Sequence, residues 1–449
     1  MPSPRSRSAR AAAVSAGLLA GGAAVVIAGG GTGLNDTRAA AAVRAENGAS
    51  VVTIAGSQRK GIRNGLGSEA RFRKPAGLAI DGEENLIIAD AGNNRIRRMT
   101  PDGEVSTVAG SRYSGKRDGR RGSSTTFNDP EGVAVDRNGD ILVADTLNQT
   151  VRRTRSDGGA TVSFRPVRGV FRVKGIAVDP GGGVYTIEEG ANWLRKLTGG
   201  NRPRVILDGL HKPSGVASGP DGSLYVADTD HQQVLRIGPA RKSFYAFAGT
   251  SNYGAQDGGP GLATLGRPAA VAVDRAGYVY IADVGTNRIR IVSPRGVMAT
   301  LAGVGQGYRN GGAGVARFNG PRGIAVTPDG ETVYVSDYRN NAIRKITGFD
   351  RERITRAAPY AVRRDRTLLR GIPVTCAGNQ PGRCVLQVSY QGQKFATVGI
   401  DLGYIGRRTV YVRIPRAART SVRQEDRTTF RVTGRFSGRR IAPYNVVAR

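Results

Sequence analysis

The chain has 449 residues, 65 of them glycine, and a formal net charge of +32. A hydrophobic share of 39% is enough to build a folded core and argues against a wholly disordered chain. Only two cysteines and two histidines are present, which excludes a disulfide-stapled miniprotein, a four-cysteine zinc site and a three-histidine metal centre within one chain.

Residues 1–45 have the features of an export signal followed by a linker. Arg5, Arg7 and Arg10 precede an uncharged run rich in Ala and Gly, and a stretch of small residues follows at 39–42. This order is typical of a secretory signal peptide. The uncharged run also nearly has the length needed to cross a bilayer, so a retained single-pass anchor stays open as the alternative. Both alternatives predict an extracellular or cell-surface location.

Residues 46–350 contain six copies of one unit. The first copy reads PAGLAID, LIIAD and RIRRM, and the other five repeat this order of short segments rich in Val, Ile, Leu and Tyr. The connections are too short for helices, so neighbouring strands must pair antiparallel. A fourth strand, such as VSTVAG, precedes the long loop of four of the units. Four strands in each of six units predict an all-β fold with a six-bladed β-propeller; a β-solenoid is the competing architecture.

The phase of the repeat predicts how the ring closes. If the PAGLAID segment is the innermost strand, the sixth unit has no fourth strand of its own in chain order. The segment Val51–Ala55 is left over at the start of the chain. We therefore expect it to complete the last blade beside Ile343–Ile346.

The repeated pattern resembles the NHL repeat, and the resemblance covers about two-thirds of the chain. It is closest in units one, two, five and six and weaker in units three and four, which lack the long loop. The resemblance implies a six-bladed propeller used for binding protein, RNA or polysaccharide. A few propeller relatives are lactonases or lyases, so the fold alone does not determine the activity.

Acidic and basic residues recur at fixed places in the units. Each second strand ends in Asp, or in Glu188 in unit three, and five units place Arg seven positions later. A metal or acid–base cluster is one interpretation. Because the pair recurs in almost every unit, we instead expect a structural pair in which the carboxylate accepts backbone N–H groups and faces the Arg. The acids at the ends of the inner strands, such as Asp81 and Asp274, are expected to cap Gly-containing turns.

The long loops of units one, two, five and six supply the candidate binding residues. These loops combine glycines with basic residues and tyrosines, a composition suited to binding an anionic chain or a sugar polymer by charge and stacking. A solvated loop set with no ligand is the alternative. The candidate residues are Arg59, Lys60, Arg63, Arg112, Tyr113, Lys116, Arg120, Arg121, Tyr253, Tyr308 and Arg309.

No catalytic residue can be assigned from the sequence. His231 stands where other units have Asn, which indicates a turn residue, and His211 is placed to reach the mouth of the channel. No nucleophile elbow, zinc-protease helix or phosphate-binding loop is present. We predict no resident cofactor, and a divalent cation in the channel remains the alternative.

Residues 351–449 are predicted to form a separate basic domain. They contain 21 basic and 5 acidic residues, half of the excess charge of the chain. Segments such as CVLQVSY and TTFRVTGRF alternate polar and apolar residues, which favours a small β-sandwich. Cys376 and Cys384 flank a turn-rich loop, and in an exported protein we expect them to form a disulfide.

These observations favour an exported binding protein over an enzyme. The propeller loops would bind a protein or polysaccharide, and residues 351–449 would hold a polyanionic surface. The alternatives are a metal-dependent hydrolase or lyase of the lactonase type and a nucleic-acid-binding propeller, against which the export signal argues. A membrane is expected only if the N-terminal segment is retained. The arginine bias also has a non-functional explanation, since codon usage in a GC-rich genome produces it.

Overall fold

The computed structural model describes residues 48–163, 172–197, 203–241 and 243–357, and then a series of strands between residues 361 and 448. The predicted signal or anchor lies outside the described residues. Within them, no helix has the length and apolar character that crossing a membrane requires.

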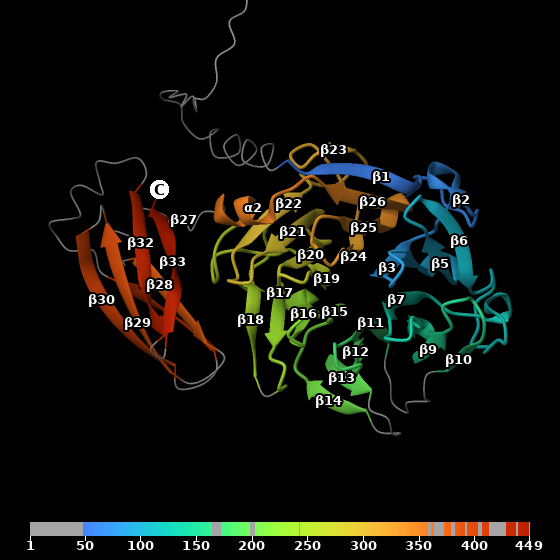
Figure 1. Ribbon diagram of the computed structural model, residues 1–449, viewed down its shortest axis with the longest axis horizontal. Coiled ribbons are helices and arrows are strands. Elements are labelled where there is room, and N and C mark those ends of the chain that lie inside the picture. Colours follow the sequence, from blue (N-terminus) through green and yellow to red (C-terminus); the bar gives the residue numbers. More distant parts are fainter. Residues whose placement is uncertain are drawn as a thin grey trace, which may run out of the picture. The chain divides into compact units, whose positions relative to one another are not determined.

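Residues 50–347 form six antiparallel sheets arranged around a central axis, as Figure 1 shows. The innermost strands are β3 (Pro75–Ile80), β7 (Pro130–Val135), β11 (Val173–Val178), β15 (Gly215–Ser218), β19 (Pro268–Val273) and β24 (Pro321–Val326). The second strands are β4 (Leu86–Asp90), β8 (Ile141–Asp145), β12 (Val184–Glu188), β16 (Leu224–Asp228), β20 (Val279–Asp283) and β25 (Val333–Asp337). The third strands are β5 (Arg95–Met99), β9 (Thr150–Thr154), β13 (Trp193–Leu197), β17 (Gln233–Ile237), β21 (Arg288–Val292) and β26 (Ala342–Thr347). The outermost strands are β6 (Glu104–Ala109), β10 (Thr161–Ser163), β14 (Arg204–Leu207), β18 (Phe244–Gly249), β22 (Met298–Ala302) and, for blade six, β1 (Ser50–Gly56). The predicted six-bladed propeller is confirmed.

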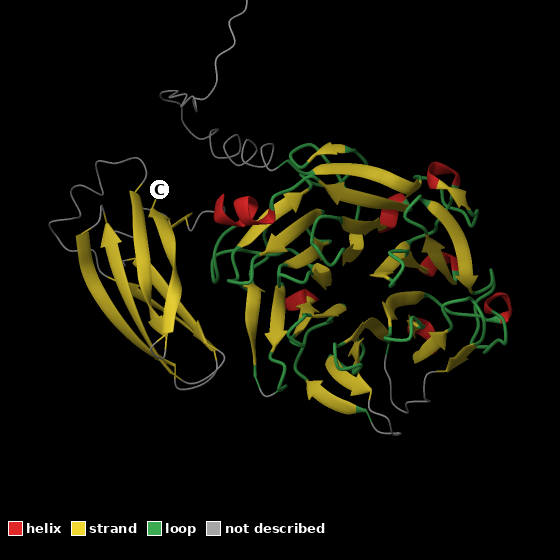
Figure 2. Cartoon of the chain, viewed as in Figure 1, coloured by secondary structure: helices red, strands yellow, loops and turns green. Residues whose placement is uncertain are grey.

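Among the residues of the propeller that the structure describes, helical structure is limited to single turns, drawn red in Figure 2. Four of these 3₁₀ turns join a second strand to a third strand: Ala91–Asn93, Thr146–Asn148, Thr229–His231 and Tyr338–Asn340. Two more lie in long loops, at Gly67–Glu69 and Gly122–Ser124. In the same loops, the short strand β2 (Gly65–Leu66) pairs with β6, and β23 (Gly311–Gly312) pairs with β1.

The hydrophobic core is divided into clusters that each lie between two neighbouring blades. One cluster joins Leu78 and Ile88 of blade one to Ala325 and Ile343 of blade six. The second strands of blades one to five are buried at every residue, because each packs between a neighbouring blade on either side. This explains why their sequences are short continuous apolar runs rather than alternating ones.

The predicted ring closure is also confirmed. Strand β1 pairs antiparallel with β26, with Val51 opposite Ile346 and Ala55 opposite Ile343. Figure 1 shows the blue first strand lying along the orange last blade. A single cooperative ring therefore depends on a strand from the opposite end of the repeat region.

Close contact between inner strands explains the glycine that follows the first two residues of most of them. A Cβ atom on Gly132 would lie 2.1 Å from the carbonyl oxygen of Lys174 on the next blade, and one on Gly323 would lie 2.0 Å from that of Ala76. Neither position has room for a side chain. Glycine thus lets neighbouring inner strands approach closely around the channel.

Asparagine side chains latch several neighbouring blades together. Asn94 has a left-handed conformation, which asparagine tolerates, and its Oδ1 accepts a hydrogen bond of 2.9 Å from the backbone N–H of Asp129 in blade two. Asn341 of blade six accepts the same bond from Lys74 of blade one, also at 2.9 Å. The latch therefore also spans the point of ring closure.

Beyond the last blade, α2 (Arg351–Ala357) docks against the propeller. Arg351 donates to Asp274 Oδ2 at 2.8 Å, and Ile354 is buried in the cluster between blades five and six. Asp274 also accepts the N–H of Tyr278, so it caps its turn as predicted.

The remaining strands form a five-stranded and a two-stranded sheet. The first has the order β27-β33-β32-β29-β30 and the second pairs β28 with β31. Their bounds are β27 (Ala361–Val362), β28 (Ile372–Gly378), β29 (Gly382–Tyr390), β30 (Gln393–Leu402), β31 (Gly406–Val412), β32 (Thr428–Phe436) and β33 (Arg439–Ala448). The sandwich stays a prediction. Cys376 lies in β28 and Cys384 in β29, but their side chains lie outside the described residues, so the disulfide also stays a prediction.

Ring closure can be tested with two adjacent substitutions in β1. Val51 is fully buried and Val52 is 42% exposed. We expect Val51→Asp to lower the free energy of unfolding by roughly 4 kcal/mol or more, because it places an unpaired carboxylate in the core. Val52→Asp makes the same change on the solvent side and is expected to alter stability by less than about 0.5 kcal/mol. Thermal melts followed by circular dichroism measure both, and equal melting temperatures would contradict the closure.

Candidate functional site

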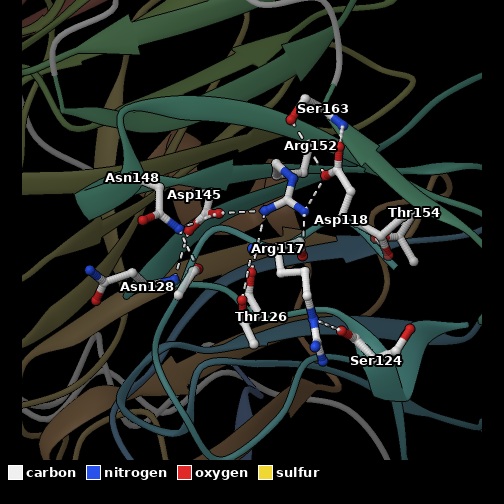
Figure 3. Close-up of polar contacts among 12 residues, drawn as sticks. Arg117, Asp118, Ser124, Thr126, Asn128, Asp145, Asn148, Arg152, Thr154 and Ser163 are labelled. Carbon is white, nitrogen blue, oxygen red and sulfur yellow. Dashed lines mark hydrogen bonds and ion pairs between the residues drawn. The ribbon is translucent and has the colours of Figure 1, made fainter. Parts of the chain in front are cut away.

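Buried carboxylate–guanidinium pairs anchor the long loops. In blade two, Arg152 Nη1 donates to Asp145 Oδ2 at 3.1 Å, and both side chains are fully buried. Its Nη2 reaches into the long loop, where it donates to the carbonyl oxygen of Arg117 at 3.0 Å and to the carboxylate of Asp118. Figure 3 shows Arg152 lying between these two acids. One side chain thus ties the loop to the blade.

The same arrangement recurs in the other blades that have a long loop. The third-strand arginine of each of these blades donates to a loop Asn or Asp, over 2.7–2.9 Å: Arg97 to Asn64, Arg290 to Asp257 and Arg344 to Asn310. Blade four has no long loop and no arginine at this place, since Leu235 stands there. There His231 Nδ1 lies 2.8 Å from Asp228 Oδ2 instead. The prediction that these acids form structural pairs with the third-strand arginines is therefore confirmed for these blades.

Burial dominates the electrostatics of these acids. It raises the pKa of Asp90 to about 6 against the opposing effect of Arg97 and of hydrogen bonds from Asn93 and Arg73. Burial likewise raises the pKa of Asp145 and of Asp337. Removing the partner cation from such a pair leaves an uncompensated buried acid, which is the costly outcome.

All eleven candidate binding residues of the loops are exposed. Tyr113 and Tyr253 are 63% and 64% exposed. Arg112 lies over the Tyr113 ring, 4.8 Å from its centroid, and Arg63 forms an exposed ion pair of 3.8 Å with Glu69. The residues do not form one cluster but are distributed over four loops.

Ring closure makes blades six, one and two consecutive, and their loops carry nearly all of the loop charge. Loop 57–74 has six basic residues and one acidic residue, loop 111–129 has five and two, and loop 304–320 has two and none. Loop 250–267 of blade five has one of each. Asn341 of blade six donates to the carbonyl oxygen of Gln58 in the loop of blade one at 3.3 Å, so these two blades meet directly. We call the surface of loops 304–320, 57–74 and 111–129 the basic arc.

A second group of charged residues lines the mouth of the central channel. The second residue of the inner-strand motif faces the channel in every blade, and across the six blades it is Ala76, Glu131, Lys174, Ser214, Ala269 and Arg322. The cavity that they line has a volume of about 70 Å³. Three of the six blades therefore place a charge in a narrow channel.

These charges form a connected network. Arg322 Nη2 lies 3.1 Å and 3.2 Å from the two carboxylate oxygens of Glu131, although blade one stands between their blades. Lys174 Nζ lies 2.6 Å from Glu189 Oε1 and 4.0 Å from Glu131 Oε2. Burial raises the pKa of Glu131, and the positive charges of Arg322 and Lys174 oppose this effect.

This network was not predicted from the sequence. The signal was present: the residue after the first position of each inner strand changes from blade to blade, while the positions around it repeat. His211, which was expected near the channel mouth, is exposed, lies beside His231 at 5.3 Å between ring centroids, and is not among the residues lining the channel cavity. In the described part of the chain, no group of three His, Cys, Asp or Glu side chains is arranged to hold a metal ion.

A family model of the NHL repeat matches residues 127–153, 210–237 and 318–346, which lie in blades two, four and six. These three blades are NHL repeats, as the sequence pattern predicted. The matched ranges include blade four, for which a weaker resemblance was expected. The segment that matches in each case begins three to five residues before the inner strand and ends in the third strand.

Curated relatives share these repeats at low identity. The human "NHL repeat-containing protein 2" is 26% identical over 414 residues, which cover 73% of this chain and 56% of that protein. "Protein SUPPRESSOR OF QUENCHING 1, chloroplastic" of Arabidopsis thaliana is 26% identical over 311 residues, covering 66% of this chain and 27% of the relative. This chain thus spans only about a quarter to a half of the length of these relatives.

Solved structures support the fold. A protein described as an auxiliary nutrient binding protein from Bacteroides ovatus superposes with a TM-score of 0.55 and 18% sequence identity, covering 67% of this chain and 77% of that one. A Bacteroides thetaiotaomicron protein of unknown function gives a TM-score of 0.57 at 21% identity, covering 67% and 76%. At these identities the likeness concerns the propeller fold alone.

The loop anchor can be tested in blade two with adjacent arginines. Arg152 is fully buried, whereas Arg153 is 35% exposed and lies 3.0 Å from Asp136. We expect Arg152→Met to cost about 3–5 kcal/mol of stability, because Asp145 loses its buried partner. Arg153→Met should cost no more than about 1 kcal/mol.

The same two variants also report on the loop. Well below its melting temperature, the Arg152→Met protein should be cut by trypsin within loop 111–129 faster than the Arg153→Met protein. Similar cleavage rates would mean that Arg152 does not anchor the loop.

Proposed function

We propose that this protein is an exported ligand-binding propeller whose basic arc binds an anionic polysaccharide. The observation that carries the proposal is the set of three consecutive loops with thirteen basic and three acidic residues. A continuous surface of one charge attracts a polyanion over a distance and holds it at many points. The nutrient-binding description of a structural neighbour is in keeping with a binding role.

The anchored backbone of the loops supports this function. Each of the three loops of the arc is bonded to a buried arginine, as described above. A loop that is already ordered loses less conformational entropy when a ligand binds. The exposed tyrosines, such as Tyr113 and Tyr308, add surfaces on which sugar rings can stack.

Residues 351–449 would add a second basic module, and residues 1–45 would direct export. Both roles follow from the sequence features set out above. In this proposal the module holds the protein at a polyanionic surface such as a cell wall, while the arc binds its ligand.

The arc is tested by neutralising one arginine in each loop: Arg59→Gln, Arg120→Gln and Arg309→Gln together. The matched control is Arg137→Gln, Arg275→Gln and Arg295→Gln, which makes the same charge change in exposed hairpins at the opposite ends of the strands. Binding of fluorescent polygalacturonate is measured by anisotropy at several salt concentrations, with dextran as the neutral polymer.

We expect the arc variant to bind the polymer at least about tenfold more weakly. The slope of the logarithm of the binding constant against the logarithm of the salt concentration should become shallower by about 2, because each charge contact contributes roughly 0.7–0.9 to that slope through counterion release. The control should match the wild type. If the two triple variants lose affinity equally, the arc is not the site and the charge acts only as a whole. Unchanged binding in both would assign the polymer to residues 351–449.

A further inference from the structure

The charges in the channel mouth are not required by the propeller itself. Blades one, four and five build the same inner strand with Ala76, Ser214 and Ala269 at the equivalent position. The side chains of Glu131 and Lys174 are only 9% and 10% exposed, so their burial carries a desolvation cost. Charged groups that converge in a concave, largely buried site are a mark of ligand binding.

The shape of the mouth limits what can enter. Ala76 lies on the blade between those of Arg322 and Glu131, and the far wall is formed by Ser214 and Ala269. These small residues leave a cavity of about 70 Å³. A space of this size holds a few water molecules or one small polar group, but not a whole sugar ring.

The cations at the mouth have N–H donors and positive charge available for a ligand. Arg322 bonds Glu131 through Nη2 and lies over the Tyr338 ring, 4.8 Å from the centroid. A guanidinium has five N–H donors in a planar fork that suits a carboxylate. Lys74 Nζ lies 5.9 Å from the centroid of the same ring, and no carboxylate of the described residues is within ion-pair distance of it.

The backbone at the mouth is held in an uncommon conformation. Lys74 and Asp129 both precede a proline and have φ values of +54° and +53°. Residues with side chains rarely adopt this region. Arg172 and Lys212, at the equivalent places of blades three and four, also have φ values of +45°, so this conformation belongs to the repeat. In Lys74 and Asp129 the asparagine latch of the neighbouring blade bonds the N–H and holds this conformation.

We propose that the channel mouth binds the carboxylate group of a small ligand or chain end through Arg322, with Lys174 and Lys74 adding positive charge. Glu131 is the internal carboxylate that partners Arg322 when no ligand is present. The ligand carboxylate competes with it for the same cation. This site goes beyond polymer binding at the basic arc, and Lys74 is the one of its cations that lies in a loop of the arc.

Competition between two carboxylates makes binding depend on pH. Burial already raises the pKa of Glu131, and the other groups facing it are the cations Arg322 and Lys174 and the acids Asp129 and Glu189. An incoming carboxylate adds a further negative charge, so Glu131 takes up a proton as the ligand binds. Affinity therefore increases as the pH falls towards the pKa of Glu131.

The test uses isothermal titration calorimetry of the whole protein with glucuronate, with glucose as the neutral probe and inorganic phosphate as a different anion. Glu131→Gln removes the competing carboxylate, and we expect it to tighten glucuronate binding about tenfold and to abolish the pH dependence. Arg322→Gln should abolish binding. Lys74→Gln, which breaks no ion pair, should weaken it several-fold.

Glu104→Gln and Arg137→Gln make the same changes at exposed positions away from the mouth and should leave binding unchanged. The proposal is overturned if millimolar glucuronate does not bind, if glucose or phosphate binds equally well, or if Arg322→Gln and Arg137→Gln behave alike. If Glu131→Gln does not fold, the Lys74→Gln and Arg322→Gln results still decide. The arc variants at Arg59, Arg120 and Arg309 do not change Arg322, Glu131, Lys174 or Lys74, so failure at one site does not imply failure at the other.

Discussion

Pairing of β1 with β26 is the constraint on which the rest of the structure depends. Every second strand is packed between two neighbouring blades, so an open ring would leave blades one and six with bare apolar faces. Closure covers these faces by pairing Val51 with Ile346 from the other end of the repeats. It also makes blades six, one and two consecutive. If blade six did not lie beside blade one, there would be neither a continuous basic arc nor a contact between Arg322 and Glu131.

The buried arginines connect stability to function. A fully buried ion pair is often no more stabilising than apolar residues of the same volume, so stability alone is a weak reason to keep one. In this propeller the arginines bond the loops as well as the acids, and blade four, which has no long loop, has Leu235 at that place. Arg195 of blade three pairs with Glu188 although that blade has no long loop, so the arginines serve a loop only in the four blades that have one. The pairs are best understood as anchors that order the surface presented to a ligand.

The basic arc and the channel mouth both favour anions, but through different physics. Charges of the arc are exposed, so they act over a distance and are weakened by salt. Charges of the mouth lie in a partly buried site of lower effective dielectric, where each contact is stronger and geometry matters more. Arg322, Glu131 and Lys174 therefore suit recognition of one chemical group, whereas residues such as Arg59 and Arg120 suit a long chain.

The sequence by itself determined the blades, the turn-capping acids, the Asp–Arg pairing and the closing strand. These follow from short-range patterns that repeat six times, so aligning the units with one another identifies the equivalent positions. The eleven loop residues lie at the surface, and their binding role stays a prediction. Only the tertiary structure brought Glu131, Lys174 and Arg322 together, because they lie in three different blades and meet only around the closed ring. The one local sign of that network was the inner-strand position that varies among otherwise similar units.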